Sequence, residues 1–420
     1  MGFFSFFRRQ AAVSPVSSNT SVSSTVSSTP VISVSPAAPA GFARNGSQKT
    51  SGGSSSLPED GSELDVYDGN GVRLHLGERE YHASGGEGAV YTLPNNQKFL
   101  IKIYKKETLC DVKKMNAIRN RIADMARDSF LPGKTWLAWP LMPVFNENRE
   151  VIGFAMRKST GRSLLSLRGP ANIRKFFPAW NRRTLVKVAL DFVQKVKILS
   201  DHGVLINDFN PANFLVNDAG QVSFIDCDSF QVRSSAGGQH ITRTFFPSYS
   251  APELLNKKPL LGQPRNIHQV EFGAAMIVFH ILMCGLHPYA YYDPDHKSDC
   301  GTPDENLLKG RCPFGRGAGC MMPPGNWYNL WSHLTCSLKN AFIMTFRDGH
   351  ANPGARATLE HLEAELQKML HIMDMDPARE DLMPQTAKPH AKTFHMPLKP
   401  GSRQYPFQYS GKGRIGKNFT

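Results

Sequence analysis

The sequence has no run of about 18 apolar residues, so it predicts no helix that could span a membrane. Its seven cysteines form no C-x-x-C pair, which excludes a disulfide-rich scaffold and favours a reducing compartment. Its 35 glycines and 29 prolines show no repeating period, so a fibrous class is excluded. What remains is a chain of 420 residues that is 40% hydrophobic, long enough for one large core or for two to three domains.

Acidic residues are fewer than basic ones, 35 against 49, which gives a net charge of +14. Such an excess is compatible with a polyanionic partner, such as a nucleotide, a nucleic acid or an acidic membrane surface, but also with an ordinary solvated basic surface. Residues 388–417 interleave basic and aromatic side chains, as segments that bind single-stranded nucleic acid do. No folded platform is predicted that would present these rings, so nucleic-acid binding is unsupported.

The first 62 residues are predicted to be a disordered leader rich in serine, threonine and proline. Arg44 and Lys49 are the only formal charges in 11–57, and such a segment buries too little surface to offset its ordering entropy. The aromatic and then basic residues 3–9 allow a weak membrane contact. The leader is compatible with a cytoplasmic protein and also with a bacterial effector exported into a host cytosol.

Ordered sequence begins near Val66, and the first part consists mainly of short apolar runs bounded by turn residues. These runs predict strands at 72–76, 89–93, 99–104, 137–144 and 151–158, with one helix at 111–128. The strand-rich part therefore extends over about 63–158.

The second part is mainly helical. At 184–202 apolar residues recur at the spacing of one helix face, and 274–283 is apolar on nearly every side, which predicts a fully buried helix. Short strands are expected at 204–206, 214–216 and 222–225. This order predicts an α+β fold in two unequal lobes with a site between them. The helical lobe is placed at about 159–372, and a basic flexible tail at 373–420.

A glycine-rich turn and a lysine form the first pair of candidate site motifs. Gly85, Gly86 and Gly88 lie before an expected strand, and glycines let backbone N–H groups approach phosphate oxygens because no Cβ intervenes. Lys102 stands in the apolar run 99–104, where it can hold phosphates as a fixed charge. Taken singly, the turn is typical of any hairpin, and the lysine is typical of a strand edge protected from aggregation.

Polar residues near two later strands form the second pair. Asp208 and Asn213 share a loop, where a carboxylate can accept a hydroxyl proton and an amide oxygen can bind Mg²⁺. Asp226 follows the apolar strand 222–225 and is a candidate Mg²⁺ ligand. The simpler interpretations are an Asx-turn loop and a capping residue. All four motifs in this order favour a functional site.

With these motifs in this order, the sequence resembles the protein-kinase superfamily over about 66–370. It is most similar to divergent bacterial eukaryotic-like Ser/Thr kinases with a D-x-N-x-x-N catalytic loop, here Asp208 to Asn213. The resemblance implies a two-lobed protein-kinase-like domain at 63–372, ATP as the phosphoryl donor, and Mg²⁺ with Mn²⁺ as a possible substitute.

The resemblance also implies a role for each matching residue. Asp208 would be the catalytic base and Lys102 would bind the α- and β-phosphates, while Asn213 and Asp226 would hold the metal. Glu253, in an A-P-E motif, would form a buried ion pair with Arg356. The implied ATP-binding residues are Gly85, Gly86, Gly88, Val90, Lys102, Met156 and Lys158, with 156–159 as the hinge of the adenine pocket.

Several positions depart from the family's pattern. Asn207 replaces the arginine before the base, so we expect no need for activation-loop phosphorylation there. The D-F-G motif reads Asp-Cys-Asp at 226–228, and Val270 lies near the position of the usual anchoring aspartate of the buried helix. The helix at 111–128 offers no glutamate at the place where the partner of Lys102 is expected.

We expect ATP- and Mg²⁺-dependent phosphoryl transfer to Ser or Thr hydroxyls of a protein substrate. One alternative is a nucleotide-binding pseudokinase scaffold, because Ala83 replaces the first glycine of the loop and Asn210 replaces the lysine that contacts the γ-phosphate. The other is a small-molecule kinase of the aminoglycoside-phosphotransferase type, which also lacks that lysine. The expected pair of Glu253 and Arg356 argues against it, because a peptide-docking segment needs that brace.

Overall fold

The computed structural model describes residues 63–94, 96–256, 262–291, 300–315, 322–323 and 325–385. The predictions made for the leader (1–62), for a membrane contact at its start, and for residues 386–420 of the tail lie outside these ranges. Within them, no helix is long and apolar enough to cross a bilayer.

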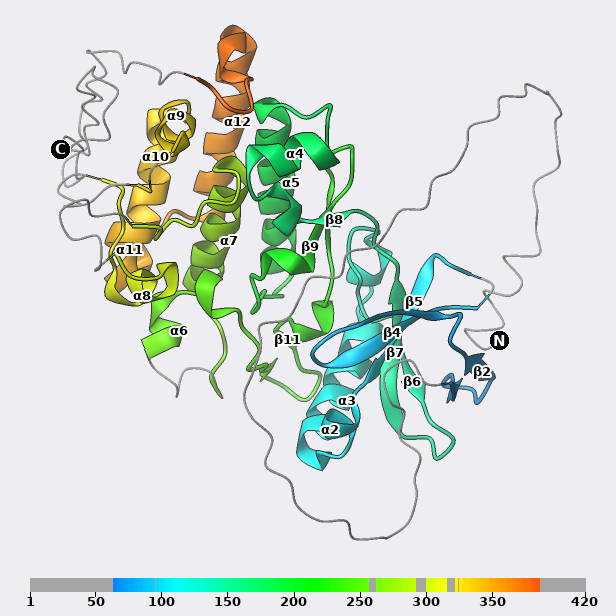
Figure 1. The fold of residues 1–420 in the computed structure, drawn as a ribbon. Helices are drawn as coiled ribbons and strands as arrows, with labels where there is room; N and C mark the ends of the chain where they lie inside the picture. The colour runs from blue at the N-terminus through cyan, green and yellow to red at the C-terminus, as the bar shows by residue number, and fades with distance from the viewer. Residues whose placement is uncertain are drawn as a thin grey trace, which may run out of the picture.

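The N-terminal lobe is built on one seven-stranded sheet with the order β2-β1-β6-β7-β5-β4-β3, and its paired neighbours are antiparallel. The strands are β1 (Leu64–Tyr67), β2 (Arg73–Leu76), β3 (Tyr81–Ser84), β4 (Gly88–Thr92), β5 (Phe99–Tyr104), β6 (Met142–Phe145) and β7 (Val151–Arg157). Two helices, α2 (Lys106–Leu109) and α3 (Val112–Arg127), connect β5 to β6 (Figure 1). This order places β5, which carries Lys102, between β4 and β7.

The helix predicted at 111–128 is confirmed as α3. Asp111 caps its N-terminus by accepting a hydrogen bond from the backbone N–H of Lys114 at 3.0 Å. Its apolar residues lie on one face, are buried and pack toward β6. They are Met115, Ile118, Ile122 and Met125.

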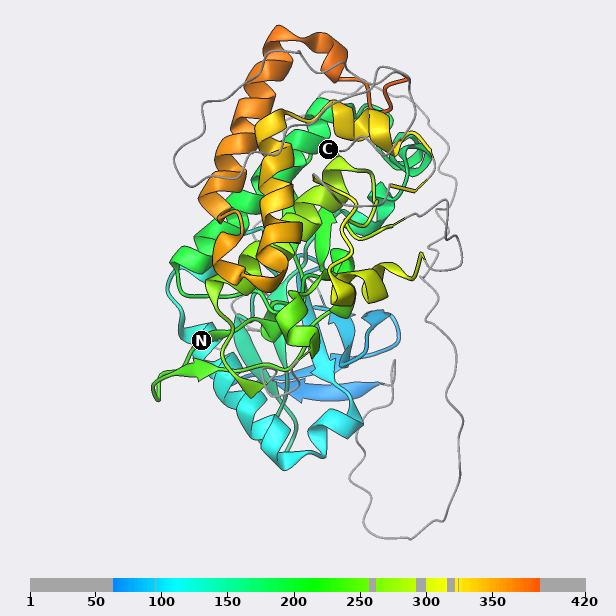
Figure 2. The same cartoon turned by 90° about the vertical axis from the view of Figure 1, so that its left-hand side faces the viewer.

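The C-terminal lobe is a group of helices arranged around α5 (Arg182–Asp201), which packs against both α7 (Ile267–Leu282) and α12 (Leu359–Met375) (Figures 1 and 2). The other α-helices in the described part of this lobe are α4 (Pro170–Phe176), α6 (Pro252–Asn256), α8 (Pro303–Lys309), α9 (Trp327–Ser332), α10 (Cys336–Ile343) and α11 (Gly349–Ala351). Short strands lie beside these helices: β8 (Arg162–Ser163), β9 (Phe214–Val216) and β10 (Val222–Phe224) form one sheet, and β11 (Val232–Arg233) pairs with β12 (Gln239–His240). The α+β fold in two lobes is therefore confirmed.

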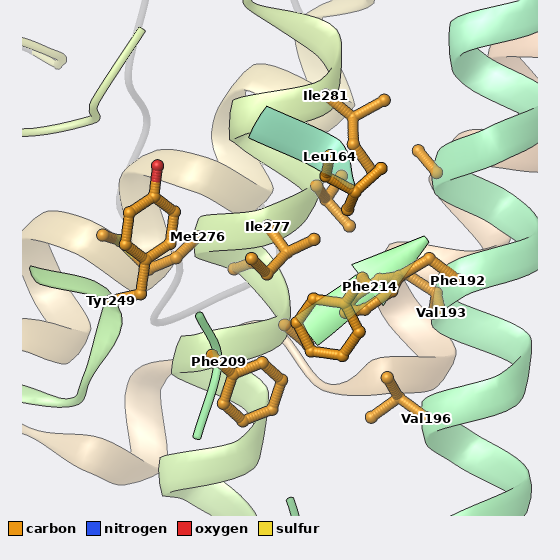
Figure 3. Close-up of a cluster of buried hydrophobic side chains, with 14 of the residues drawn as sticks. Leu164, Phe192, Val193, Val196, Phe209, Phe214, Tyr249, Met276, Ile277 and Ile281 are labelled. Atoms are coloured by element: carbon orange, nitrogen blue, oxygen red, sulfur yellow. The ribbon is translucent and has the colours of Figure 1, made fainter. Parts of the chain in front are cut away.

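Buried apolar side chains join α5, β9 and α7 into one core (Figure 3). Phe192 of α5 meets Phe214 of β9 edge to face, with ring centroids 5.0 Å apart. On α7 every residue from Val270 to Leu282 is buried, as its apolar composition predicts. This core supports the loop that carries Asp208, because β9 follows that loop directly.

Both long helices of this core begin earlier than the sequence pattern indicated. Helix α5 starts at Arg182, where Asn181 accepts a hydrogen bond from the N–H of Thr184 at 3.0 Å. Helix α7 starts at Ile267 behind the capping box of Asn266 and Gln269. The caps are polar, so hydrophobic periodicity alone does not include them in the helix.

The prediction of a strand at 204–206 is wrong. Leu205 makes one isolated antiparallel bridge, to Gln231, and no ladder continues from it. The reason is spatial: the chain leaves α5 at Asp201 and turns at once into the loop of Asp208, which leaves no length for a paired strand.

The strand expected at 137–144 narrows to β6, Met142–Phe145. Pro140 lacks the N–H that a continuous ladder needs. The N–H of Ala138 donates instead to the carbonyl of Phe224 in the other lobe, at 2.9 Å. This stretch therefore links the two lobes rather than extending the sheet.

The helical lobe continues past the boundary expected at 372. That position lies inside α12, which ends at Met375, and the chain then stays on the lobe up to residue 385. The carbonyl of Glu380 accepts a hydrogen bond from the N–H of Arg182 at 3.0 Å, and Leu382 is buried. Apolar residues beyond 372 explain this, because they cover the end of the core.

Candidate active site

The glycine-rich turn between β3 and β4 is closed by one backbone bond, from the N–H of Gly85 to the carbonyl of Gly88 at 2.9 Å. A Cβ on Gly88 would lie 2.4 Å from the carbonyl oxygen of Ile103 on β5, so only glycine fits there. Gly86 has open space around it. On the same pair of strands, Val90 lies opposite Lys102.

Lys102 is buried in β5 and its ammonium contacts two carboxylates. Nζ donates to Oδ1 of Asp226 at 2.5 Å, and to Oδ1 and Oδ2 of Asp228 at 2.9 and 3.0 Å. The hydroxyl of Tyr104 donates to Oδ2 of Asp228 at 2.8 Å. Burial alone would lower the pKa of Lys102, but the two carboxylates outweigh burial and raise it.

Asp226 stands at the turn that follows β10. Its backbone is left-handed, with φ of 58°, a conformation that aspartate adopts more readily than most residues. The N–H and hydroxyl of Ser229 both donate to the carbonyl of Asp226, at 3.1 and 2.8 Å, and so close a 3-10 turn over Cys227–Ser229. This turn brings the carboxylates of Asp226 and Asp228 to the same ammonium.

Asp208 lies on the loop before β9 and is 9% exposed. Nδ2 of Asn213 donates to its Oδ2 at 3.0 Å, whereas its Oδ1 is buried with no hydrogen-bond partner in the described part of the chain. Burial, and then the charge of Asp226, raise the pKa of Asp208 to about 6. The carbonyl of Asn213 accepts from the N–H of Ile225 at 2.9 Å, which ties this loop to the residue before Asp226.

The loop of Asp208 is anchored on α7 by packing. The ring of Phe209 lies so close to Gly273 that a Cβ there would be 2.2 Å from the ring atom Cδ2. Val270 lies near the position where the family's pattern has an anchoring aspartate, and it is fully buried and apolar. An aromatic ring against a glycine therefore fixes the loop of Asp208 here.

Asn207, in place of the usual arginine, connects the loop to the segment after Asp226. Its Nδ2 donates to the carbonyl of Ser229 at 3.1 Å and also contacts the hydroxyl of Thr242. Thr242 in turn donates to the same carbonyl at 2.6 Å. These are neutral hydrogen bonds between buried groups, so the contact needs no phosphate to balance a charge.

The ion pair expected between Glu253 and Arg356 forms with two parallel hydrogen bonds, at 2.9 and 2.8 Å. The guanidinium also donates to the carbonyls of Gly349 and His268, both at 2.9 Å, and lies over the ring of Phe272. The pair therefore joins α6, which follows the activation segment, to the end of the helical lobe.

The expected hinge, 156–159, begins in the last two residues of β7 and continues beyond the strand. Met156 is buried and pairs with Leu100 of β5, and the N–H of Lys158 donates to the carbonyl of Lys98 at 2.9 Å. The chain then passes into the helical lobe. The adenine-binding role of Met156 and Lys158 stays a prediction.

A cavity of about 380 Å³ lies away from these residues, where the end of α3 meets α5 and β11. None of the motif residues lines it. At its edge Asp124 of α3 contacts Nε2 of His240 at 2.7 Å and accepts from the N–H of Ser235 at 3.0 Å. These contacts fix the β11–β12 hairpin on α3.

Sequence reasoning missed the role of Asp228. It stood out only as a departure from D-F-G, and no acid was identified for Lys102. The signal was present, because an aspartate in an apolar segment must be paired if it is buried. Its side chain is 1% exposed, and Lys102 is the pairing cation.

Comparisons with known proteins agree with this arrangement. No family model matches the sequence. Protein kinase YegI of Escherichia coli (strain K12) is 30% identical over 233 residues, which are 54% of this chain and 34% of that protein. The protein of the same name from Escherichia coli O157:H7 is 30% identical over 210 residues, 49% of this chain and 31% of that protein. The chain thus spans about a third of the length of these relatives.

Among solved structures, the ROP18 kinase domain in complex with AMP-PNP and sucrose matches 75% of this chain and 86% of that chain, with a TM-score of 0.48 and 15% identity. The curated relatives and the two-lobed α+β fold described above support a place among divergent protein-kinase-like proteins.

Proposed function

We propose that this protein transfers the γ-phosphoryl group of ATP, with Mg²⁺, to Ser or Thr hydroxyls of a protein substrate. The observation that supports it best is the meeting of four motif residues from distant segments. Lys102 contacts Asp226 at 2.5 Å, Asn213 contacts Asp208 at 3.0 Å, and a backbone bond of 2.9 Å joins Asn213 to Ile225.

The donor set fits Mg²⁺, which prefers carboxylate and amide oxygens. Asp226 is one third exposed, and Lys102 contacts only its Oδ1. Asn213 binds Asp208 through its nitrogen, so its amide oxygen is not used in that contact. These two residues would hold the ion, which would supply positive charge next to the phosphates of the nucleotide.

Asp208 is the proposed proton acceptor. Asn213 fixes Oδ2, and the other oxygen is buried with no hydrogen-bond partner in the described residues, so it is an unused acceptor that a substrate hydroxyl would have to reach on binding. A pKa of about 6 keeps most of this carboxylate ionised at neutral pH while leaving it basic enough to accept a proton. Lys102 supplies a fixed positive charge for the phosphate oxygens.

The protein-substrate assignment is supported by the brace of Glu253 and Arg356. It fixes α6, the helix that follows the segment on which a peptide would dock in the family that the sequence resembles. A small hydroxyl compound would not need such a brace. We therefore place the small-molecule alternative second.

The test is transfer of label from γ-labelled ATP to a Ser/Thr peptide library, with Mg²⁺ or Mn²⁺. We expect Asp226→Ala and Lys102→Ala each to reduce transfer by about 100-fold or more, because each removes charge from the phosphate site. Asp65→Ala is the matched control, because that carboxylate pairs with Arg73 on the surface.

Transfer at the wild-type rate by Asp226→Ala would refute the mechanism. A nucleotide-dependent rise in melting temperature of the wild-type protein without transfer of label would show the scaffold instead. If small hydroxyl compounds are labelled and peptides are not, the proposal of a protein substrate is wrong.

A further inference from the structure

A lysine binds phosphates well only if an acidic side chain holds its ammonium in position. Helix α3 provides no such side chain for Lys102. The buried side chains of α3 are apolar except for Arg121, which is 8% exposed. Its Nε is buried with no hydrogen-bond partner among the described residues. Asp124, an acid of the same helix, is used by His240. The helix therefore presents a cation where a carboxylate was expected.

Asp228 has the properties of the missing acid. It is 1% exposed, both of its oxygens lie within 3.0 Å of Nζ of Lys102, and the hydroxyl of Tyr104 fixes Oδ2 at 2.8 Å. After Lys102, Arg121 of α3 is the next cation whose charge acts on Asp228. The 3-10 turn Cys227–Ser229 holds its backbone.

We propose a charge exchange, in which the acid and the cation at this site lie on the reverse elements compared with the pattern of the family. The loop that carries Asp226 supplies, through Asp228, the carboxylate that positions Lys102. Helix α3 supplies, through Arg121, a cation that stabilises this carboxylate. Asp228 is a positioning residue, since it acts through Lys102. The inference rests on the proposed function, because positioning matters only if Lys102 binds phosphates.

Both members of the exchange contribute to the charges around this site. Two cations, Lys102 and Arg121, face two carboxylates, Asp226 and Asp228, and Glu87 of the β3–β4 turn adds a more distant negative charge. Removing one partner of a buried pair leaves an uncompensated charge, which is strongly destabilising. Asp228 is therefore not replaceable by a neutral residue unless the helix changes too.

The two carboxylates that hold Lys102 differ in their exposure to solvent. Asp226 is one third exposed and Asp228 is enclosed. Asp228 can therefore keep the ammonium in place when Asp226 turns to another partner. The position of Lys102 then depends on the loop after β10 and not on a carboxylate brought in by α3.

The experiment uses the full chain with Asp228→Asn, which keeps the side-chain volume, and Asp228→Asn combined with Arg121→Glu, which returns an acid to the helix. We expect Asp228→Asn to lower kcat about 100-fold with a smaller change in the KM for ATP, because Lys102 keeps Asp226 but loses its fixed position. Adding Arg121→Glu should restore kcat at least 10-fold. Asp65→Asn is the control.

A second readout needs no catalysis. The melting temperature of the nucleotide-free protein should fall by about 6 °C or more in Asp228→Asn, from loss of a buried pair, and recover by several degrees when Arg121→Glu is added. If the wild-type protein transfers no phosphate, the proposed function fails while this measurement still tests the charge exchange.

Recovery in the double variant supports the exchange, since a role of Asp228 in packing alone would not respond to a new acid on α3. A double variant no better than Asp228→Asn in both readouts overturns it. If Asp228→Asn does not fold, Arg121→Gln decides: an unchanged melting temperature overturns the proposal, and a fall of several degrees supports it.

Discussion

Two aspartates two positions apart contact the same lysine in different surroundings. Asp226 is accessible from one side and has a left-handed backbone, whereas Asp228 is enclosed and also bound by Tyr104. The more exposed Asp226 can therefore exchange its partner, whereas the enclosed Asp228 cannot. The two oxygens of Asp208 also differ, because Asn213 fixes Oδ2 whereas Oδ1 is buried with no hydrogen-bond partner in the described part of the chain.

His280 is a residue at which pH should control stability. Nε2 donates to the carbonyl of Leu164 at 3.0 Å, which leaves Nδ1 of the neutral ring as an acceptor 2.7 Å from the hydroxyl of Tyr249. Burial lowers the pKa of His280 to about 4, from 6.5 in the unfolded chain. Between these values the unfolded chain binds the extra proton, so the free energy of unfolding decreases as pH falls from 6.5 toward 4.

We expect His280 to account for a loss of about 2 kcal/mol between pH 7 and pH 5. His280→Gln should remove most of this contribution, and urea denaturation at both pH values measures it. Burial also lowers the pKa of His287, so part of the pH dependence should persist. A pH dependence equal to that of the wild-type protein in His280→Gln would contradict the assignment.

At the scale of elements, the catalytic loop depends on how closely it approaches α7. Gly273 has the ring of Phe209 where a side chain would be, and Asn207 ties the same loop to Ser229. The brace of Glu253 and Arg356 fixes α6 near the N-terminus of the same helix, where Arg356 also donates to the carbonyl of His268. Position 208 is thus determined by contacts between elements.

Gly273→Ala tests this anchor. Glycine to alanine in a helix interior normally stabilises a protein by about 1 kcal/mol, but here the new methyl group would overlap the ring of Phe209. We expect a melting temperature lower by several degrees, and phosphoryl transfer at least 10-fold lower, because the neighbouring Asp208 moves with the ring.

Gly133→Ala is the matched control, since nothing lies within 4 Å of its added Cβ. Phe209→Leu in the Gly273→Ala background should recover part of the lost stability by reducing the overlap. If Gly273→Ala is more stable than the wild-type protein and fully active, the loop is not anchored in this way.

At the scale of the whole molecule, residues after 372 belong to the helical lobe. Arg379 donates to the carbonyl of His333 at 2.8 Å, Asn181 donates to Glu380 at 2.9 Å, and Leu382 is buried. These contacts close the end of the lobe where α5 begins. The lobe is therefore incomplete without this segment.

Truncation tests this extension. A chain ending at 385 should melt within about 2 °C of the full chain, whereas a chain ending at 372 should melt at least several degrees lower, because the burial of Met373 and Leu382 is lost. Thermal denaturation of the three chains measures it. Equal melting temperatures for the chains ending at 372 and 385 would contradict the role given to this segment.

The two lobes, the long helices, most strands of the sheet and most of the residues that meet at the site could be predicted from the sequence. Apolar periodicity and turn residues are local properties, so 111–128 and 99–104 could be located from composition and spacing alone. The strand at 204–206 was wrong because the pairing of a short apolar run depends on which backbone lies beside it.

The acid that holds Lys102 and the contact that anchors the loop of Asp208 could be identified only in the folded chain. Lys102 and Asp228 are 126 positions apart, and their contact exists because β5 and the turn after β10 meet between the lobes. Phe209 and Gly273 likewise meet only when β9 packs on α7. A charge or a glycine is visible in a sequence, but its partner is selected by burial, which depends on the complete fold.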